Sequence, residues 1–171
     1  MKWVVVILAI LVVLVAAVWA VGNTLPKEHV ASRKARYKQP PEAIWAAITN
    51  VEGMPAWRTD LKSIQRLPDK NGKPAWVEAM DMGEVPLEVE EFTAPRRLVT
   101  RIAGADLPFG GTWTFEIERV EGGATLTITE RGEIYPALFR FMARYIFGYT
   151  STMETYLKNL GKKFGEEVTP S

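Results

Sequence analysis

Two glutamates and one arginine are the side chains that the sequence best places to do chemistry inside a fold. Glu78 has the strand parity of the apolar Trp76, and Glu130 has that of Ile128, so both carboxylates are expected on a covered face. Arg101 is the candidate counter-charge. A buried carboxylate beside an arginine can orient a polar ligand head or act as a general acid or base. The alternative is that a bulge turns these groups outward, or that they pair on a rim.

Other catalytic chemistries find little support. The absence of Cys removes thiolate chemistry, and a single histidine, His29, just past an apolar run, argues against a Ser-His-Asp triad or a multi-histidine metal site. The glycine pairs at 110–111 and 122–123 open no helix, and the acidic runs at 81–84 and 88–91 lack the spacing of a calcium loop. No metal and no cofactor are therefore expected. Three tyrosines remain as donors to a developing oxyanion: Tyr135, Tyr145 and Tyr149.

An apolar run opens the chain. From Trp3 to Val21, nineteen consecutive residues carry no charge, which in a helix spans about the ~30 Å of a bilayer core. The run predicts one transmembrane helix, with residues 1–26 as anchor and linker and residues 27–171 as a single domain. The alternative is a signal peptide cleaved after Ala20, although the run exceeds the usual ~7–15 apolar residues of such signals.

Basic residues favour a cytoplasmic position for the domain. Lys2 alone precedes the apolar run, whereas Lys27, Arg33, Lys34 and Arg36 follow it closely, and loops rich in Lys and Arg stay on the cytoplasmic side. The expectation is a single-pass membrane protein; cleavage near Ala20 would instead give a periplasmic or secreted domain. Beyond residue 26, 20 basic residues balance 20 acidic ones, so no nucleic-acid surface is expected. Protein partners stay open.

The order of elements follows from alternation and turn residues. Apolar Trp113 and Phe115 alternate with Thr114 and Glu116, as in a sheet with one wet and one covered face. The pattern predicts a strand at 29–38, short helices at 42–49 and 51–57, and strands at 61–67, 75–81, 85–92, 98–103, 112–120 and 125–131.

A helical pattern from Ile134 to Phe164 ends the domain, with apolar residues at steps of three and four. We expect it to divide at Gly148, because Ser151 and Glu154 have the spacing of a capping box. Residues 136–147 are apolar nearly all round, and we predict that they contact the bilayer interface near the anchor and gate a cavity. The alternative, which the sequence supports equally, is that the short helices bury residues 136–147.

Several segments resemble a known family. Residues 40–45 (PPEAIW) with Trp57 beyond them, residues 111–115 (GTWTF) and residues 156–160 (YLKNL) resemble the START-like, Bet v 1-like superfamily (SRPBCC), in particular its polyketide cyclase/dehydrase-like members. The resemblance covers residues 29–165. It implies an α+β helix-grip fold: a curved antiparallel sheet of about seven strands, two short helices and a long C-terminal helix, here preceded by the transmembrane helix.

In this superfamily the space between sheet and C-terminal helix commonly holds a hydrophobic small molecule or lipid. The side chains expected to line it are aromatic residues and methionines, which a plain core would also contain. They are Trp57, Trp76, Met80, Phe92, Trp113, Phe115, Met142, Tyr145, Tyr149 and Met153, with Met54 beside them.

Three functions stay open. The favoured one is a membrane-anchored protein that binds a hydrophobic ligand or lipid. The second is a cyclase or dehydratase acting on a polyketide-like or aromatic substrate through Glu78, Arg101 and Glu130, without metal or histidine chemistry. The third is a membrane-tethered interaction module with no small-molecule ligand.

Overall fold

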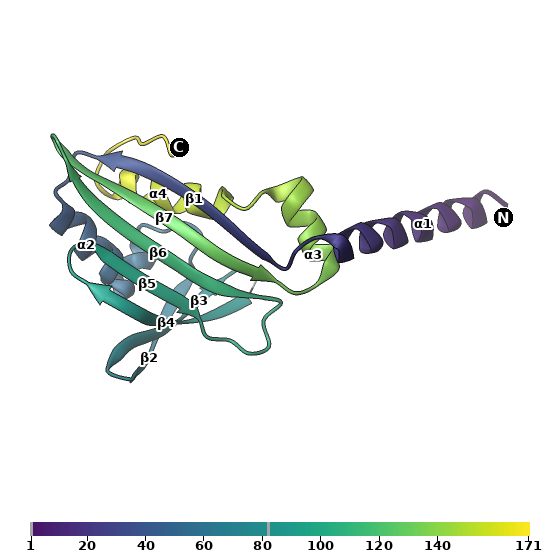
Figure 1. Cartoon of the computed structure of the whole chain (residues 1–171), viewed down its shortest axis with the longest axis horizontal. Coiled ribbons are helices and arrows are strands. Elements are labelled where there is room, and N and C mark those ends of the chain that lie inside the picture. Colours follow the sequence, from purple (N-terminus) through teal and green to yellow (C-terminus); the bar gives the residue numbers. More distant parts are fainter. Residues whose placement is uncertain (1, 82) are drawn as a thin grey trace.

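A seven-stranded antiparallel sheet forms the body of the protein (Figure 1). The computed structural model describes residues 2–81 and 83–171. The strand order is β1-β7-β6-β5-β4-β3-β2, so only β1 pairs with a strand distant in sequence. This confirms the α+β helix-grip fold. The strands are β1 (Glu28–Tyr37), β2 (Ser63–Lys70), β3 (Lys73–Met80), β4 (Gly83–Thr93), β5 (Arg97–Ile102), β6 (Phe109–Val120) and β7 (Gly123–Ile134).

The helices lie at the concave side of the sheet and at its α1 end (Figure 1). They are α1 (Lys2–Thr24), α2 (Pro41–Thr49), the 3-10 helix η1 (Val51–Ala56), α3 (Ala137–Met142), the π-helix η2 (Ala143–Phe147) and α4 (Ser151–Lys163). α2 begins at Pro41. Proline is accommodated in the first turn of a helix because the N–H that it lacks would have no hydrogen-bond partner within the helix.

The C-terminal helix is divided, as its sequence predicted. Gly148 lies between η2 and α4 with φ +73°, a conformation that costs a glycine little and an L side chain more. The predicted capping box is wrong, because the residue that caps α4 is Thr150 and its side chain makes no hydrogen bond to a backbone N–H of the helix. Thr150 precedes the first turn of α4, and its hydroxyl donates to the Glu154 carboxylate at 3.0 Å, whereas Ser151 is already helical.

The core fills the space between the sheet, α2 and α4. Met153, Leu157 and Leu160 of α4 are fully buried against Leu126 and Ile128 of β7. Two polar contacts tie α4 to β1. The buried Tyr37 hydroxyl donates to the Leu157 carbonyl at 2.9 Å, and Arg33 Nε donates to Glu154 Oε1 at 2.9 Å. α4 is therefore part of the core rather than a movable cover.

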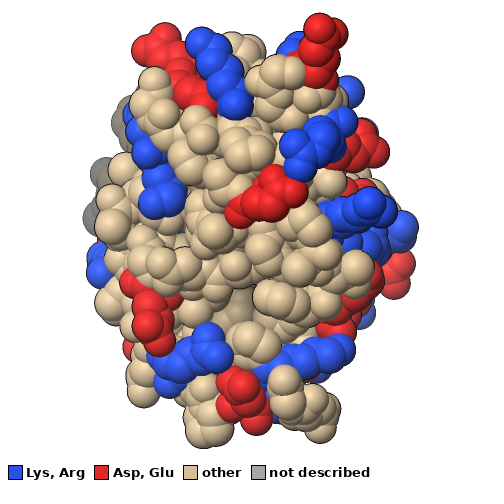
Figure 2. All heavy atoms as spheres, turned by 90° about the vertical axis from the view of Figure 1, so that its left-hand side faces the viewer, with Lys and Arg blue, Asp and Glu red and all other residues tan. Residues whose placement is uncertain are grey.

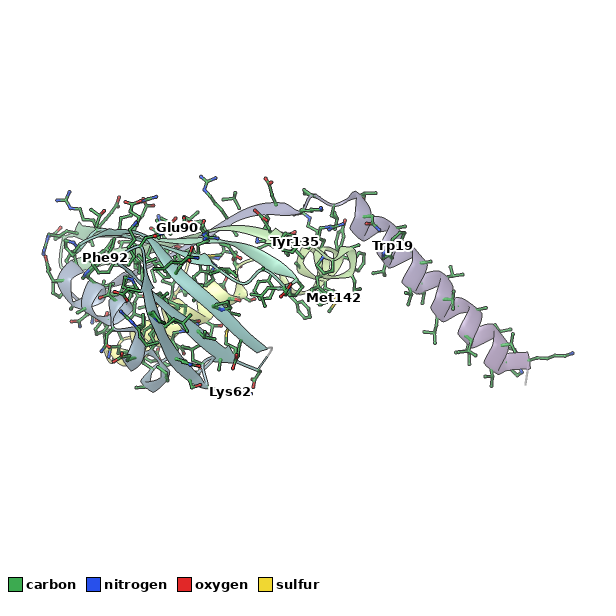
Figure 3. The ribbon with its side chains drawn as sticks, turned by 90° about the horizontal axis from the view of Figure 1, so that it is seen from below. Trp19, Lys62, Glu90, Phe92, Tyr135 and Met142 are labelled. Carbon is green, nitrogen blue, oxygen red and sulfur yellow. The ribbon has the colours of Figure 1, made fainter. Side chains whose placement is uncertain are left out.

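α1 is long and apolar enough to cross a membrane, and its apolar side chains are exposed. Its C-terminal turn is docked on α3 (Figure 3). Gly22 is buried so closely that a Cβ there would lie 2.1 Å from the Ala137 carbonyl oxygen. The buried Arg140 guanidinium donates to the Gly22 carbonyl at 2.9 Å and also to the carbonyl of Tyr135. The bond to Gly22 satisfies a carbonyl that the C-terminus of α1 leaves free, and because the same guanidinium also binds the Tyr135 carbonyl it fixes α1 to the domain.

Candidate functional site

Burial of the concave face falls off towards the α1 end of the sheet. On β6, Phe115 and Ile117 are buried while Trp113 is partly exposed; on β7, Ile128 is fully buried while Glu130 is partly exposed. α4 and α2 cover only the other part of this face. We call the partly exposed set the open half of the concave face; its members are His29, Met80, Trp113, Glu130 and Tyr149.

A histidine and a glutamate meet in this open half. His29 of β1 places its Nε2 3.6 Å from Glu130 Oε1, and its ring stacks on Tyr149 with the ring centroids 4.2 Å apart. Gly132, which faces His29 across the two strands, makes the room. A Cβ at Gly132 would lie 2.3 Å from His29 Cε1 and 2.9 Å from Glu130 Oε1.

Burial moves the pKa values of these two groups in opposite directions. It raises the pKa of Glu130 to about 7, against the opposing hydrogen bond of the Trp113 indole, because removal from water disfavours the carboxylate. It lowers the pKa of His29, because the imidazolium is disfavoured in the same way. Near neutral pH the carboxyl group therefore titrates while the imidazole is neutral, a state suited to general acid or base chemistry.

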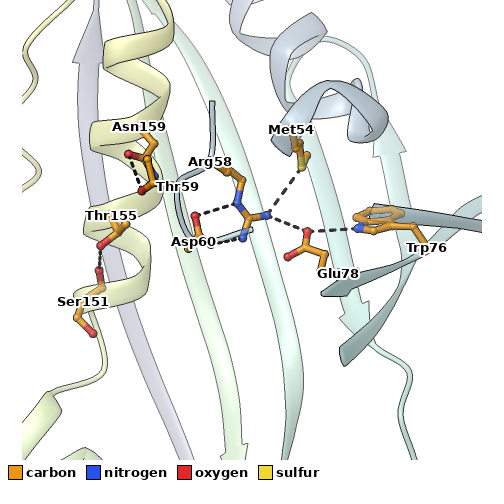
Figure 4. Close-up of polar contacts among 9 residues, drawn as sticks. All are labelled: Met54, Arg58, Thr59, Asp60, Trp76, Glu78, Ser151, Thr155 and Asn159. Carbon is orange, nitrogen blue, oxygen red and sulfur yellow. Dashed lines mark hydrogen bonds and ion pairs between the residues drawn. The ribbon is translucent and has the colours of Figure 1, made fainter. Parts of the chain in front are cut away.

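A buried ion pair lies deeper, between η1 and β3 (Figure 4). Arg58 Nη1 is 2.8 Å from Glu78 Oε1, and Arg58 Nη2 is 2.5 Å from Asp60 Oδ2. The side chains of Arg58 and Glu78 are each 7% exposed. The Trp76 indole N–H also donates to Glu78, at 3.2 Å. Burial opposes the guanidinium charge, yet the Glu78 and Asp60 carboxylates and the Tyr156 phenol together outweigh it, so the pKa of Arg58 lies above its ordinary value.

Arg101 does not supply the counter-charge to Glu78 or Glu130, and that expectation is wrong. The register of β4 and β5 sets Arg101 opposite Glu88, on the convex face of the sheet. There Arg101 pairs with Glu88 and, at 2.8 Å, with Glu90. Arg58 takes the predicted role beside Glu78.

Aromatic rings surround Tyr156 of α4 in the centre of the grip. The ring centroids of Trp57, Phe115 and Trp113 lie 5.3, 5.5 and 6.2 Å from that of Tyr156. The Arg58 guanidinium carbon lies 5.1 Å from the same ring. Among the residues that the structure describes, the buried Tyr156 hydroxyl has no hydrogen-bond partner, which leaves one polar atom available at the inner end of the aromatic cluster.

The remaining predicted lining residues are dispersed. Phe92 is 49% exposed at the far end of the sheet, where it packs edge-on against Trp45 with the centroids 4.9 Å apart (Figure 3). Met142 and Tyr145 belong to α3 and η2, and Met153 is fully buried in the core. Phe92 therefore lies apart from the aromatic cluster around Tyr156.

Sequence reasoning missed His29, Arg58 and Tyr156 as polar groups of the interior. His29 lies on the same side of β1 as Ala35 and Tyr37, which are both buried. That alternation could have placed His29 on the covered face. Arg58 lies in a loop, where no periodicity indicates direction. Tyr156 belongs to the apolar face of α4, but nothing in that pattern shows that its hydroxyl lacks a partner.

Apolar side chains of α3 and η2 are exposed next to the end of α1. Tyr145, Ile146 and Phe147 are 59%, 63% and 62% exposed, and Leu138 and Phe139 lie nearby in α3. Monomeric soluble proteins rarely expose a contiguous apolar patch of this kind without a binding role. We call these five residues the α3–η2 patch.

The opposite end of the domain is different in character. Figure 2 shows Lys and Arg side chains interspersed with Asp and Glu there, with neither sign dominating. A groove of about 760 Å³ lies between the start of α2, the β4–β5 turn and β6, lined by Pro41, Pro95, Arg97, Ile117 and Arg119 among others. Two of its arginines form ion pairs: Arg97 with Glu116 and Arg119 with Glu42.

Comparison with known proteins places the fold. The family described as "Polyketide cyclase / dehydrase and lipid transport" matches residues 29–165. The chain belongs to this family. The expected superfamily membership is thereby confirmed, and the match begins at His29, after α1. No curated protein matches the sequence.

Solved structures agree at low sequence identity. The Zhui aromatase/cyclase from Streptomyces sp. R1128 is 10% identical, with a TM-score of 0.66 over 78% of this chain and 91% of that one. A START superfamily protein from Mycobacterium smegmatis is 16% identical, with a TM-score of 0.59 over 77% of this chain and 99% of that one. At these identities the likeness establishes the fold alone.

Proposed function

We propose that this protein is a membrane-anchored binding protein that takes a hydrophobic small molecule or lipid into the open half of the concave face. Its family includes lipid transport, and its N-terminal helix has the length and apolarity of a membrane span. The observation that carries the proposal is the docking of α1 on α3. It holds the exposed α3–η2 patch beside the point where α1 would leave the bilayer.

The patch and the interior are joined by a short path along the chain. Tyr149 follows Phe147 by two residues and stacks on His29, which belongs to the open half. A lipid that enters beside Phe147 would pass this stack and reach Trp113. Aromatic side chains suit both ends of that path, because they bury large apolar areas and also occupy the membrane interface.

The proposal also includes the orientation of the chain. The basic residues that follow α1, beginning with Lys27, favour a cytoplasmic domain over a periplasmic one. In that orientation the α3–η2 patch lies at the cytoplasmic surface of the bilayer.

Photo-crosslinking from vesicles tests the proposal. The full chain is reconstituted in phosphatidylcholine vesicles that contain a small fraction of a long-chain alcohol with a diazirine in its tail, irradiated and digested. We expect label on peptides of β6 and β7 as well as on α1. Ile146→Glu should remove most of the β6–β7 label and leave the α1 label, which serves as the internal control. Label confined to α1 in the wild-type protein would refute uptake.

The Glu130–His29 pair supports a second candidate function, a cyclase or dehydratase step at a ketone. Glu130 as carboxylate would remove a proton from the carbon next to the carbonyl, and the enolate would form beside His29 and Tyr149. Deuterium exchange at C1 and C3 of 2-dodecanone in D2O isolates that proton transfer. Exchange above background that Glu130→Gln abolishes supports the candidate; exchange at the background rate removes it.

A further inference from the structure

We propose that the open half of the concave face selects an amphiphile with an uncharged hydroxyl or carbonyl head, and discriminates against anionic lipids of the same chain length. The inference rests on the proposed binding function and names the class of ligand. It follows from a charge inventory of the side chains that face the concave side. Acidic groups outnumber basic ones there, and the basic ones are already committed.

The guanidinium groups on the concave side have partners. Arg58 is held between Glu78 and Asp60: its Nη1 lies 2.8 Å from Glu78 Oε1 and its Nη2 lies 2.5 Å from Asp60 Oδ2. Arg33 of β1 has its Nε 2.9 Å from Glu154 of α4. Arg66 of β2, which the register sets opposite Trp76, has its Nη2 3.1 Å from Asp69 Oδ1. None of the three can bind a carboxylate or phosphate without leaving a carboxylate of the protein unpaired, which is costly where the pair is buried.

The two arginines of α3 and η2, Arg140 and Arg144, also provide no guanidinium group to bind an anionic head on the concave side. Arg140 is buried and turned to the α1 side, where it donates to the carbonyls of Gly22 and Tyr135 and, at 3.4 Å, of Ile134. Arg144 lies on the exposed surface of η2.

Glu130 is the acidic group that a ligand head would meet. It is opposite Trp113 on β6 and Ala31 on β1, with His29 at 3.6 Å and Gly132 next on its own face. Tyr149 covers His29 from the segment before α4. Around it are a neutral imidazole, an indole and a phenol, so an anionic head would face a carboxylate with no compensating cation.

An uncharged head fits these partners. A hydroxyl can donate to the Glu130 carboxylate and accept from an imidazole N–H, and a carbonyl can accept from the protonated carboxyl group. An ammonium head would be attracted by Glu130. However, burying both ions costs more than their attraction returns unless further acceptors are present, and the neutral rings supply few.

The test uses three twelve-carbon probes that differ only in the head: dodecanol, dodecanoate and dodecylamine, each with a diazirine at the tail. The full chain in non-ionic detergent micelles is irradiated at pH 8, where Glu130 is ionised. The readout is the β6–β7 label divided by the α1 label, because α1 reports how much probe the micelle holds. Glu133→Gln, on the same strand and opposite face, is the matched control.

In the wild-type protein the ratio for the alcohol should exceed those for the acid and for the amine by about tenfold, equivalent to about 1.4 kcal/mol. In Glu130→Gln the labelling ratio for the acid should rise to within about threefold of the ratio for the alcohol. The reason is that the carboxylate of the probe no longer faces a second negative charge in a site shielded from water. Glu133→Gln should change nothing. His29→Gln, a second variant, should lower the alcohol ratio without raising the acid.

Three results would overturn the inference: equal labelling by acid and alcohol in the wild type, preference for the amine, or unchanged selectivity in Glu130→Gln. The proposed function fails in a different way. If none of the three probes labels β6 or β7, the concave face has no ligand site. That result contradicts the proposed function, and the selectivity inference is then wrong for the same reason.

Discussion

Replacement of Arg58 by methionine should destabilise the domain more than any other single exchange in the Arg58–Glu78–Asp60 cluster. Methionine keeps the length of the arginine stem and removes the charge. Glu78, with a side chain 7% exposed, then retains only the Trp76 indole as a hydrogen-bond donor, and Asp60 loses its partner at 2.5 Å. Breaking a buried pair in this way costs about 3–5 kcal/mol, because a carboxylate is left buried without compensation.

The reciprocal exchange, Glu78→Gln, should cost less. Arg58 keeps Asp60, and a glutamine oxygen can still accept from Trp76, so about 1–3 kcal/mol is expected. The double variant Arg58→Met with Glu78→Met should be less destabilised than Arg58→Met alone, because it leaves no carboxylate at position 78. That reversal distinguishes an ion-pair effect from a loss of packing volume.

Urea unfolding of the full chain in non-ionic detergent, followed by tryptophan fluorescence, measures these differences. Arg101→Met on the convex face is the matched control. Its pair with Glu90 is exposed and Glu88 keeps Lys70 as a partner at 2.7 Å, so a loss of about 0–1 kcal/mol is expected. A loss below about 1 kcal/mol for Arg58→Met would contradict the ion-pair account, with about 3–5 expected. A double variant at least as unstable as Arg58→Met alone would also contradict it.

Three further predictions concern other parts of the molecule. Gly22→Ala should separate α1 from α3, because its Cβ would lie 2.1 Å from the Ala137 carbonyl oxygen; a cysteine pair introduced across α1 and α3 should then lose its disulfide, and undiminished cross-linking would contradict the docking. The contribution of Glu130 to stability should fall by about 2 kcal/mol between pH 5 and pH 8, as this carboxyl group, whose folded pKa is about 7, releases the proton that the folded state favours; the lowered pKa of His29 acts in the opposite direction. Glu130→Gln should reduce the change in the free energy of unfolding between pH 5 and pH 8. If that change is the same in the variant and the wild type, a group other than Glu130 causes it. Gly148→Ala should cost about 1 kcal/mol through its positive φ alone, because nothing lies within 4 Å of the new Cβ; a shift in Tm of more than about 10 °C would indicate a steric role instead.

Much of the fold could be predicted because alternation and turn residues act locally. β6 illustrates this: Trp113 and Phe115 alternate with polar residues and do face the helices, and the strand extends by three residues at its start beyond the predicted 112–120. The break at Gly148 was also predictable, since a glycine followed by a capping signal carries its own geometry.

The polar groups of the interior were less predictable, because each depends on contacts between distant parts of the chain. Glu78 was correctly placed on the covered face from its parity with Trp76. Its partner was not found, since Arg58 reaches it from a loop and Arg101 is separated from it by the thickness of the sheet. His29 meets Glu130 only because β1 pairs with β7, the one pairing in the sheet between strands far apart in the sequence.

The two parts of the C-terminal segment are held by different partners, and this bears on how a ligand would enter. α3 is fixed to α1 through Gly22 and Arg140, whereas α4 is fixed to β1 through the Arg33–Glu154 pair and the Tyr37–Leu157 hydrogen bond. Residues 148–150 join them. If α1 is held by a bilayer, a rotation of the sheet and α4 relative to the membrane must be absorbed in this joint. The contact that closes the joint on the inside is the stack of His29 on Tyr149, and an aromatic stack of this kind is worth about 1 kcal/mol. We therefore expect a path to Trp113 to open by loss of this stack, with the contacts of α4 in the core left in place.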